Sequence, residues 1–261
     1  MKSIIRSLWW YIHNPSYYDE LFYQIINTIK HHFSSAHYQP QQQKEMALIW
    51  CAERAVDTAT ALIKITGRDH LELFEDLYPL EFVAGKKREK ECPVMMGGAG
   101  GLSLLYHLTE HVRALHVLET GVAYGWSSLA ILLSLQKRSG AHLISTDKPY
   151  PGRNNENYVG CVIPENLKPH WTLLRHSDRK SVPLALEKMK TIDLCHYDSD
   201  KSYEGRMLTY PLLWGALQDG GIFISDDIGD NLAFRDFCEK INKIPVVLRS
   251  EKRFIGVIIK K

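Results

Sequence analysis

The sequence predicts an α/β fold in which helices cover both faces of a mostly parallel β-sheet. Short apolar segments with the length of buried strands alternate with longer segments whose apolar residues recur at helical spacing. Glycines or acidic residues follow several of these strands, as they do at the ligand-binding edge of a parallel sheet. Two final apolar segments, 245–249 and 254–259, are joined by charged residues and predict a closing hairpin after five parallel strands.

Composition limits the classes of protein to consider. The chain has 261 residues, of which 45% are hydrophobic, and this suits one α/β domain with an extension. The formal net charge of +2, from 32 basic and 30 acidic residues, argues against nucleic acid as a partner. Five scattered cysteines without a C-x-x-C pair favour a reducing compartment, and we expect a cytoplasmic protein. No apolar run is long enough for a transmembrane helix, and no signal-peptide pattern is present.

The first 95 residues predict a helical extension or cap. Residues 3–12 are aromatic and basic, and they would lie on a membrane surface, pack across the parent domain or contact a second subunit; the exposed aromatic residues suggest a homodimer. Asn14 and Pro15 predict the start of a helix that runs to about residue 33. A second helix is predicted from about 44 to 66, with Gly67 as a left-handed cap. Residues 68–95 are predicted to be irregular, with a solvated charge run at 86–91, and no site is expected in this region.

A glycine-rich segment, residues 95–101, opens the second predicted unit, which spans 96–261. It precedes a helix that we expect to end near residue 112. The segment is either a plain linker or a lid over a ligand. The lid interpretation rests on its position, because the helix leads directly into the first strand of the sheet.

The central stretch is Val117–Leu129, where a strand, a glycine turn and a helix follow one another. Gly121 and Gly125 form G-x-x-x-G, which differs from the G-x-G-x-x-G of dinucleotide-binding folds. Glu119 at the end of the strand would repel a pyrophosphate but attract an ammonium group. A ligand with a cationic amino-acid part and a nucleoside part fits this pattern, and S-adenosylmethionine is such a ligand.

Acidic residues follow three further strands. Asp147 ends the second strand, 26 residues after Gly121, where a carboxylate accepts hydrogen bonds from ribose hydroxyls in doubly wound folds. Asp198 follows the strand at 192–197, while Asp226 and Asp227 follow the strand at 222–225. Three carboxylates at neighbouring strand ends repel one another unless a cation lies among them. Oxygen ligands alone indicate Mg²⁺ or another hard divalent cation.

These motifs resemble those of class I S-adenosylmethionine-dependent methyltransferases, whose motif I reads E/D-x-G-x-x-x-G. The segment Ile192–Gly205 resembles the I-D-G-D-H-S-Y-E-G and V-D-A-D-K segments of the metal-dependent O-methyltransferases, which include the macrocin, caffeoyl-CoA and catechol types. The resemblance covers about residues 96–259 and implies a Rossmann-like, seven-stranded methyltransferase sheet.

The resemblance also implies roles for single residues. Those expected to bind S-adenosylmethionine are Glu119, Gly121, Tyr124, Gly125, Ser127, Asp147 and Asp178. For Asp178 this means contact with the adenine amino group, and the alternative is a helix cap. Asp198, Asp226 and Asp227 would bind Mg²⁺. Lys201 would take the proton from a hydroxyl of a small-molecule substrate such as a sugar, a phenol or a secondary metabolite, with its pKa lowered by the cation and by desolvation.

The sequence departs from the family patterns at two positions. Lys201 stands where macrocin-type enzymes have histidine, and Asp227 stands where catechol-type enzymes have asparagine. Lys201 could therefore also be a surface lysine at a helix start. Three other functions stay open: a metal-independent methyltransferase that acts on another atom, a nicotinamide-dependent oxidoreductase, and a non-catalytic partner protein. The missing G-x-G-x-x-G motif argues against a nicotinamide-dependent oxidoreductase. The acids at three strand ends argue against a non-catalytic partner protein.

Overall fold

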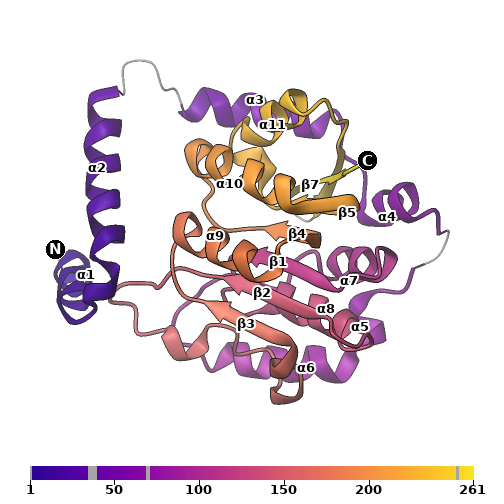
Figure 1. Cartoon of the computed structure of the whole chain (residues 1–261), viewed down its shortest axis with the longest axis horizontal. Helices are drawn as coiled ribbons and strands as arrows, with labels where there is room; N and C mark the ends of the chain where they lie inside the picture. Colours follow the sequence, from indigo (N-terminus) through magenta and orange to yellow (C-terminus); the bar gives the residue numbers. More distant parts are fainter. Residues whose placement is uncertain (1, 35–39, 69–70, 251–252) are drawn as a thin grey trace.

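A seven-stranded β-sheet forms the centre of the molecule, and its strand order is β3-β2-β1-β4-β5-β7-β6 (Figure 1). The computed structural model describes residues 2–34, 40–68, 71–250 and 253–261. The strands are β1 (His116–Thr120), β2 (His142–Thr146), β3 (Trp171–Leu174), β4 (Ile192–Tyr197), β5 (Leu217–Ser225), β6 (Val246–Ser250) and β7 (Arg253–Ile259). Strands β1 to β5 are parallel, and β7 is antiparallel to both β5 and β6. The predicted fold, including the closing hairpin, is confirmed.

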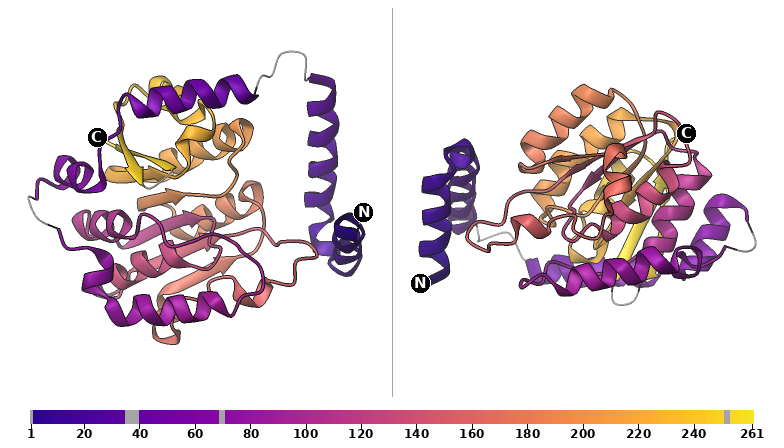
Figure 2. Two further views of the ribbon diagram at one scale, coloured as in Figure 1. Left: turned by 180° about the vertical axis from the view of Figure 1, so that it is seen from behind. Right: turned by 90° about the horizontal axis from the view of Figure 1, so that it is seen from below.

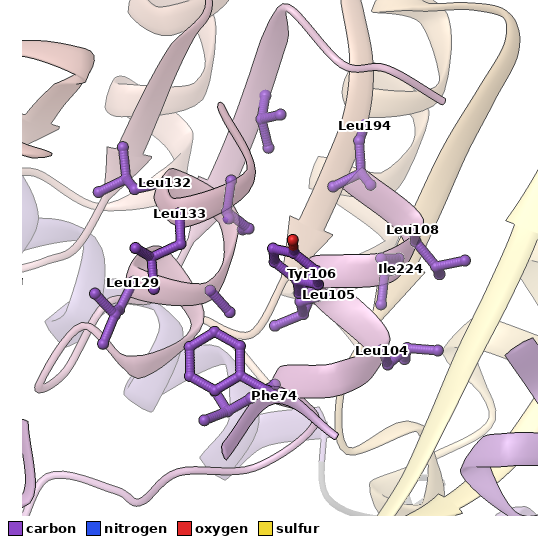
Figure 3. Close-up of a cluster of buried hydrophobic side chains, with 14 of the residues drawn as sticks. Phe74, Leu104, Leu105, Tyr106, Leu108, Leu129, Leu132, Leu133, Leu194 and Ile224 are labelled. Carbon is purple, nitrogen blue, oxygen red and sulfur yellow. The ribbon is translucent and has the colours of Figure 1, made fainter. Parts of the chain in front are cut away.

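Both faces of the sheet are buried, and the apolar residues of its central strands contribute to a separate core cluster on each face. Because side chains alternate along a strand, Val117 and Leu194 face one core cluster, while Leu118 and Cys195 face the other. The first face is covered by α7 (Leu102–His111) and α8 (Trp126–Leu135). Figure 3 shows leucines of both helices packed around Phe74 and Ile224. The second face is covered by α9 (Asp178–Met189), α10 (Tyr203–Ala216) and α11 (Ala233–Lys240).

Residues 40–90 form four helices where the sequence predicted one helix and an irregular segment. The helices are α3 (Pro40–Ala52), α4 (Thr58–Thr66), α5 (Phe74–Leu77) and α6 (Pro79–Lys90). The single helix over 44–66 was wrong because Asp57 caps a new helix, accepting a hydrogen bond from the Thr60 amide, while Val56 bridges to Leu248. Gly67 is the left-handed cap that the sequence predicted, with φ of 70°. The charge run at 86–91 belongs largely to α6, so the irregular assignment was also wrong.

The N-terminal arm consists of α1 (Lys2–His13), the 3-10 turn η1 (Pro15–Tyr17) and α2 (Tyr18–Ser34). Asn14 does not cap the following turn as predicted; its side-chain amide instead donates to the carbonyl of Trp10. Figures 1 and 2 show the arm beside the sheet domain rather than within either helical layer. None of the helices in the described ranges is long and apolar enough to cross a membrane.

Three short 3-10 turns lie in the connections, namely η2 (Glu156–Tyr158), η3 (Glu165–His170) and η4 (Ile228–Asp230). Leu62 of α4 and Phe74 of α5 lie in the same core cluster as Leu104 of α7. Helices from the first 95 residues therefore pack directly against the sheet domain. The division of the chain into units 1–95 and 96–261 stays a prediction.

Candidate active site

Two adjoining cavities lie at the carboxyl ends of the parallel strands. Their volumes are about 230 Å³ and 430 Å³, and both are lined by Gly121, Tyr150, Asp198 and Ser199. The larger cavity has the size of a small-molecule site. It is also lined by Asp147 and Asp178, whereas the smaller cavity reaches the glycine loop and the acids after β4 and β5. We call them the Asp147 cavity and the Asp226 cavity.

Gly121 lets the ends of β1 and β4 come together. Its φ of 82° lies in the left-handed region, and a Cβ atom there would collide with the backbone oxygen of Asp198. The Asp198 amide donates to the carbonyl of Thr120, and the Gly121 amide donates to the carbonyl of Thr146. Gly121 therefore allows the close approach of β1 and β4 at the point where the two cavities meet, which we call the junction.

Glu119 is fully buried beneath this junction. One of its carboxylate oxygens accepts hydrogen bonds from the hydroxyls of Ser128 (2.5 Å) and Ser145 (2.7 Å). The other oxygen, Oε1, has no hydrogen-bond partner, and His196 Nδ1 lies 3.5 Å from it. Desolvation opposes a charge on His196, but Glu119 and the acids beyond it outweigh this effect and raise the pKa of His196.

Asp147 organises the turn after β1. Its Oδ2 accepts hydrogen bonds from the amides of Val122 (3.2 Å) and Ala123 (2.9 Å), and its Oδ1 lies 3.4 Å from the guanidinium of Arg175. Burial nevertheless raises the pKa of Asp147 to about 6, because desolvation outweighs the stabilising effect of Arg175.

Asp178 is the first residue of α9, and it does not act as the helix cap that the sequence offered as an alternative. Its side chain accepts hydrogen bonds from the hydroxyls of Thr146 and Ser199. Desolvation raises the pKa of this carboxyl. Asp178 thus lies on the wall of the Asp147 cavity, held by β2 and by the loop after β4.

Tyr124 and Ser127 line the Asp226 cavity, as do Gly97 and Gly98. The Tyr124 hydroxyl donates to the carbonyl of Val94 and accepts from the amide of Met96, so this side chain holds the glycine loop over the cavity. Gly125 is the N-cap residue of α8, with φ of 90°, and its expected contact with the cofactor stays a prediction. A Cβ atom at Gly125 would lie 2.9 Å from the Cα of Gly160, so this glycine permits close packing of two loops and does not line either cavity.

The three acids after β4 and β5 meet at one edge of the sheet, as predicted. The Asp226 amide donates to the carbonyl of Tyr197, and the Asp226 carboxylate accepts from the amide of Asp227, whose φ is 50°. The buried guanidinium of Arg206 donates to the carbonyl of Asp227 (2.8 Å) and fixes this turn. Desolvation and the neighbouring acids raise the pKa of Asp226 to about 6, and desolvation raises the pKa of Asp198.

Two cationic side chains of the chain itself face these acids. Lys201 Nζ lies 3.3 Å from Asp198 Oδ1 and forms a hydrogen-bonded ion pair with Asp227. Arg253 Nη1 lies 3.8 Å from Asp226 Oδ2. Desolvation lowers the pKa of Lys201, but the two carboxylates outweigh it and the net shift is upward. The lowered pKa expected for Lys201 depends on a cation bound beside it, and it stays a prediction.

Within the described ranges, no three His, Cys, Asp or Glu side chains are arranged so that they could hold a metal ion. The structure brings Asp198, Asp226 and Asp227 to one edge but pairs them with Lys201 and Arg253.

The residues that line the Asp226 cavity and that the sequence did not single out as site residues include Tyr150, His196 and Arg253. His196 could have been found, because residues two apart on a strand share a face and His196 precedes Asp198 by two. Arg253 gave no such signal, since its approach to Asp226 depends on the pairing of β5 with β7. Tyr150 lies in the loop at 148–160, which has no regular pattern.

Comparison with known proteins agrees with this geometry. Residues 118–228 match the sequence model of a family described as "Methyltransferase domain". An O-methyltransferase from Bacillus cereus in complex with SAH superimposes with a TM-score of 0.50 at 14% identity, over 85% of this chain and 100% of that one. A predicted O-methyltransferase from Klebsiella pneumoniae gives a TM-score of 0.51 at 13% identity, over 86% and 100% of the two chains.

A predicted caffeoyl-CoA O-methyltransferase from Staphylococcus aureus gives a TM-score of 0.50 at 14% identity, over 70% of this chain and 96% of that one. The comparison with curated protein sequences gives no significant match. Residues 118–228 are therefore similar in sequence to a methyltransferase domain, and the chain has the fold of the O-methyltransferases.

Proposed function

We propose that the protein transfers a methyl group from S-adenosylmethionine to a hydroxyl group of a small molecule. The observation that carries this proposal is the junction at Gly121. There a cavity lined by Asp147 and Asp178 opens into one lined by Lys201 and Asp226. A nucleoside in the first cavity and an acceptor in the second would meet at Gly121 and Asp198.

The residues present fit S-adenosylmethionine, which supplies the methyl group when it is bound. Asp147 and Asp178 offer carboxylate oxygens to the ribose hydroxyls and the adenine amino group. Glu119 provides buried negative charge beneath the junction, and its Oε1 atom lacks a hydrogen-bond partner. Glu119 lines neither cavity, and its Oε1 atom lies 3.5 Å from His196 Nδ1, but its charge beneath the junction would stabilise an ammonium group bound there.

The acids have the ligand chemistry of a site for a hard divalent cation, but Lys201 pairs with two of them in the present arrangement, and a cation could bind only after Lys201 has moved. Asp198 Oδ1 is buried without a hydrogen bond, and all three candidate ligands are carboxylates. A divalent cation held by Asp198, Asp226 and Asp227 would lower the pKa of a coordinated hydroxyl. Lys201 Nζ would then no longer be held in its protonated form by Asp198 and Asp227, and it could accept the proton of the acceptor hydroxyl.

A metal-independent methyltransferase is the second candidate function, and one observation favours it. Lys201 and Arg253 already place positive charge against the three acids. In that case the acids would position the side chains of Lys201 and Arg253, and these two side chains would bind the acceptor.

Methyl transfer to a panel of sugars, phenols and natural-product alcohols, assayed with Mg²⁺ and with a chelator, tests the proposal and separates the two candidates. The metal-dependent form predicts loss of turnover in chelator and in Asp198→Asn. The exposed Asp219→Asn is the control, and it should retain full activity. Turnover that survives both the chelator and Asp198→Asn would favour the metal-independent form. Methylation of nitrogen acceptors alone would overturn the hydroxyl assignment.

A further inference from the structure

The N-terminal arm is attached to the sheet domain next to the Asp147 cavity, and polar contacts make the attachment. The Tyr17 hydroxyl donates to the carbonyl of Arg175 at 2.8 Å, and the Tyr17 and His176 rings lie 4.9 Å apart. Ser7 donates to the carbonyl of Pro151 at 3.2 Å. These contacts involve the loops after β2 and β3, which carry the residues that bind a nucleoside in doubly wound folds.

Glu20 forms the most buried of these contacts. Its side chain is only 8% exposed, and its Oε1 accepts a hydrogen bond of 2.8 Å from the amide of Ser177. Ser177 occupies the N-cap position of α9 without a side-chain capping hydrogen bond, and Asp178 follows it directly. Glu20 therefore connects the arm to the residue next to Asp178, which is expected to contact the adenine amino group.

Tyr23 lies one helical turn further along α2. The guanidinium of Arg179 lies 3.8 Å from the centre of its ring, within the range of a cation–π contact. Tyr23 and Glu20 line the Asp147 cavity together with Asp147 and Asp178. The wall of this cavity thus includes residues of the arm that precede Asp147 and Asp178 by about 125 to 160 positions in the sequence.

We propose that the N-terminal arm is part of the cofactor site, with Glu20 and Tyr23 closing the adenosine end of the Asp147 cavity. This inference rests on the proposed binding of S-adenosylmethionine. It gives a role to a region in which the sequence indicated no site. The other face of α2 exposes Phe22 (62%) and Ile26 (49%), so burial of a core does not explain the position of the helix.

Coupling between arm and cofactor follows from this geometry. If the cofactor binds more tightly when the arm is docked, then the bound cofactor must stabilise the docked arm by the same free energy. Cofactor binding should therefore protect the backbone amides of α2 from hydrogen exchange. Loss of an arm contact should weaken the binding of the cofactor while leaving the core of the sheet intact.

The test uses the full chain and S-adenosylhomocysteine as the probe. Calorimetry measures the dissociation constant for the wild type, Tyr23→Ala, Glu20→Ala and Glu20→Gln, and hydrogen exchange follows α2 with and without the probe. Tyr23→Ala should raise the dissociation constant about fivefold. Glu20→Ala should raise it similarly, while Glu20→Gln keeps an oxygen acceptor for Ser177 and should restore most of the affinity. Phe22→Ala is the matched control on the exposed face and should bind like the wild type.

Two outcomes separate this proposal from the proposed function. If the folded wild type does not bind S-adenosylhomocysteine, the cofactor assignment fails and the role of the arm fails with it. If the wild type binds but α2 gains no protection and Tyr23→Ala binds as tightly as Phe22→Ala, only the role of the arm is overturned. Should Glu20→Ala not fold, Tyr23→Ala and the exchange measurement still decide the question.

Discussion

His196 Nδ1 lies 3.5 Å from Glu119 Oε1 across the adjacent strands β4 and β1, with both residues buried and neither atom hydrogen-bonded. The pair lies within β1 and β4, directly beneath the strand ends that line the site. Each group would otherwise be a polar atom buried in the sheet without compensation, so the two should depend strongly on each other.

A double-mutant cycle tests this dependence. His196→Leu removes the neighbour of Glu119 Oε1, the carboxylate oxygen that accepts no hydrogen bond, and should lower the free energy of unfolding by about 3 kcal/mol. Glu119→Gln in the same chain removes the charge, so the double variant should lose clearly less than the two single variants together. Urea unfolding gives the four values. Simple additivity would show that the two side chains do not interact.

Gly121→Ala should cost more stability than Gly140→Ala. The two glycines have similar backbone angles, with φ of 82° and 75°, so both variants force alanine into the left-handed region at about 1 kcal/mol. A Cβ atom at Gly140 meets nothing within 4 Å, whereas at Gly121 it collides with the backbone of Asp198. The collision should add about 2 kcal/mol or more, measured by urea unfolding. Equal losses would mean that the ends of β1 and β4 are not in close contact.

Cofactor affinity should fall at mildly acidic pH because of Asp147. The pKa of this carboxyl is raised to about 6, so it is mostly ionised at pH 7.5 and mostly protonated at pH 5. A protonated carboxyl accepts hydrogen bonds more weakly, and binding that requires the ionised form should weaken about tenfold at pH 5. Calorimetric titrations at several pH values measure this change. Asp147→Asn should bind weakly throughout and lose this part of the pH dependence; an unchanged profile in the variant would exclude Asp147 as its source.

The same shift has a consequence for stability. Because the folded-state pKa of Asp147 lies above the ordinary value for aspartate, the folded chain binds more protons than the unfolded chain between about pH 4 and 6. Stability contributed by this group therefore decreases as the pH rises through that window. Between pH 5 and pH 7.5 the free energy of unfolding of the wild type should therefore change more unfavourably than that of Asp147→Asn, because the variant lacks this ionising group.

Lys201 and a divalent cation should compete for the same carboxylates. The ammonium of Lys201 pairs with both Asp198 and Asp227, so a metal ion can bind these two only after Lys201 has moved. Lys201→Met should therefore bind Mn²⁺ several-fold more tightly while losing most of the turnover, as measured by calorimetry and by the methylation assay. Lys168→Gln, which removes a surface lysine paired with Glu165, is the control and should behave like the wild type. Weaker Mn²⁺ binding in Lys201→Met would argue against competition.

The sequence predicted the parts of the molecule that depend on local pattern. The strand before Gly121, the strand before Asp198 and the final hairpin were all found, because alternation and turn residues are local signals. The acids at neighbouring strand ends followed from the topology of parallel sheets. The two pairings that change the chemistry, Lys201 with Asp227 and Arg253 with Asp226, depend on side-chain positions across different elements.

The break between α3 and α4 and the contact of the N-terminal arm could not be predicted either, because both depend on residues far apart in the sequence. The break between α3 and α4 depends on Val56 pairing with Leu248, which lies almost two hundred residues later. The contact of Glu20 with Ser177 joins residues 157 apart, so the N-terminal helices looked like a cap without a site. Tertiary contacts of this kind override local propensity and are not visible in a single sequence.

The central claim is that the junction at Gly121 binds S-adenosylmethionine, and a calorimetric titration of this compound into the purified chain in the presence of Mg²⁺ tests it most directly. The account predicts a dissociation constant in the micromolar range, about −8 kcal/mol of binding free energy, with clear weakening in Asp147→Asn. Absence of binding by the folded chain, together with heat from a titration of NAD, would contradict the account and would leave the likeness to methyltransferases as one of fold alone.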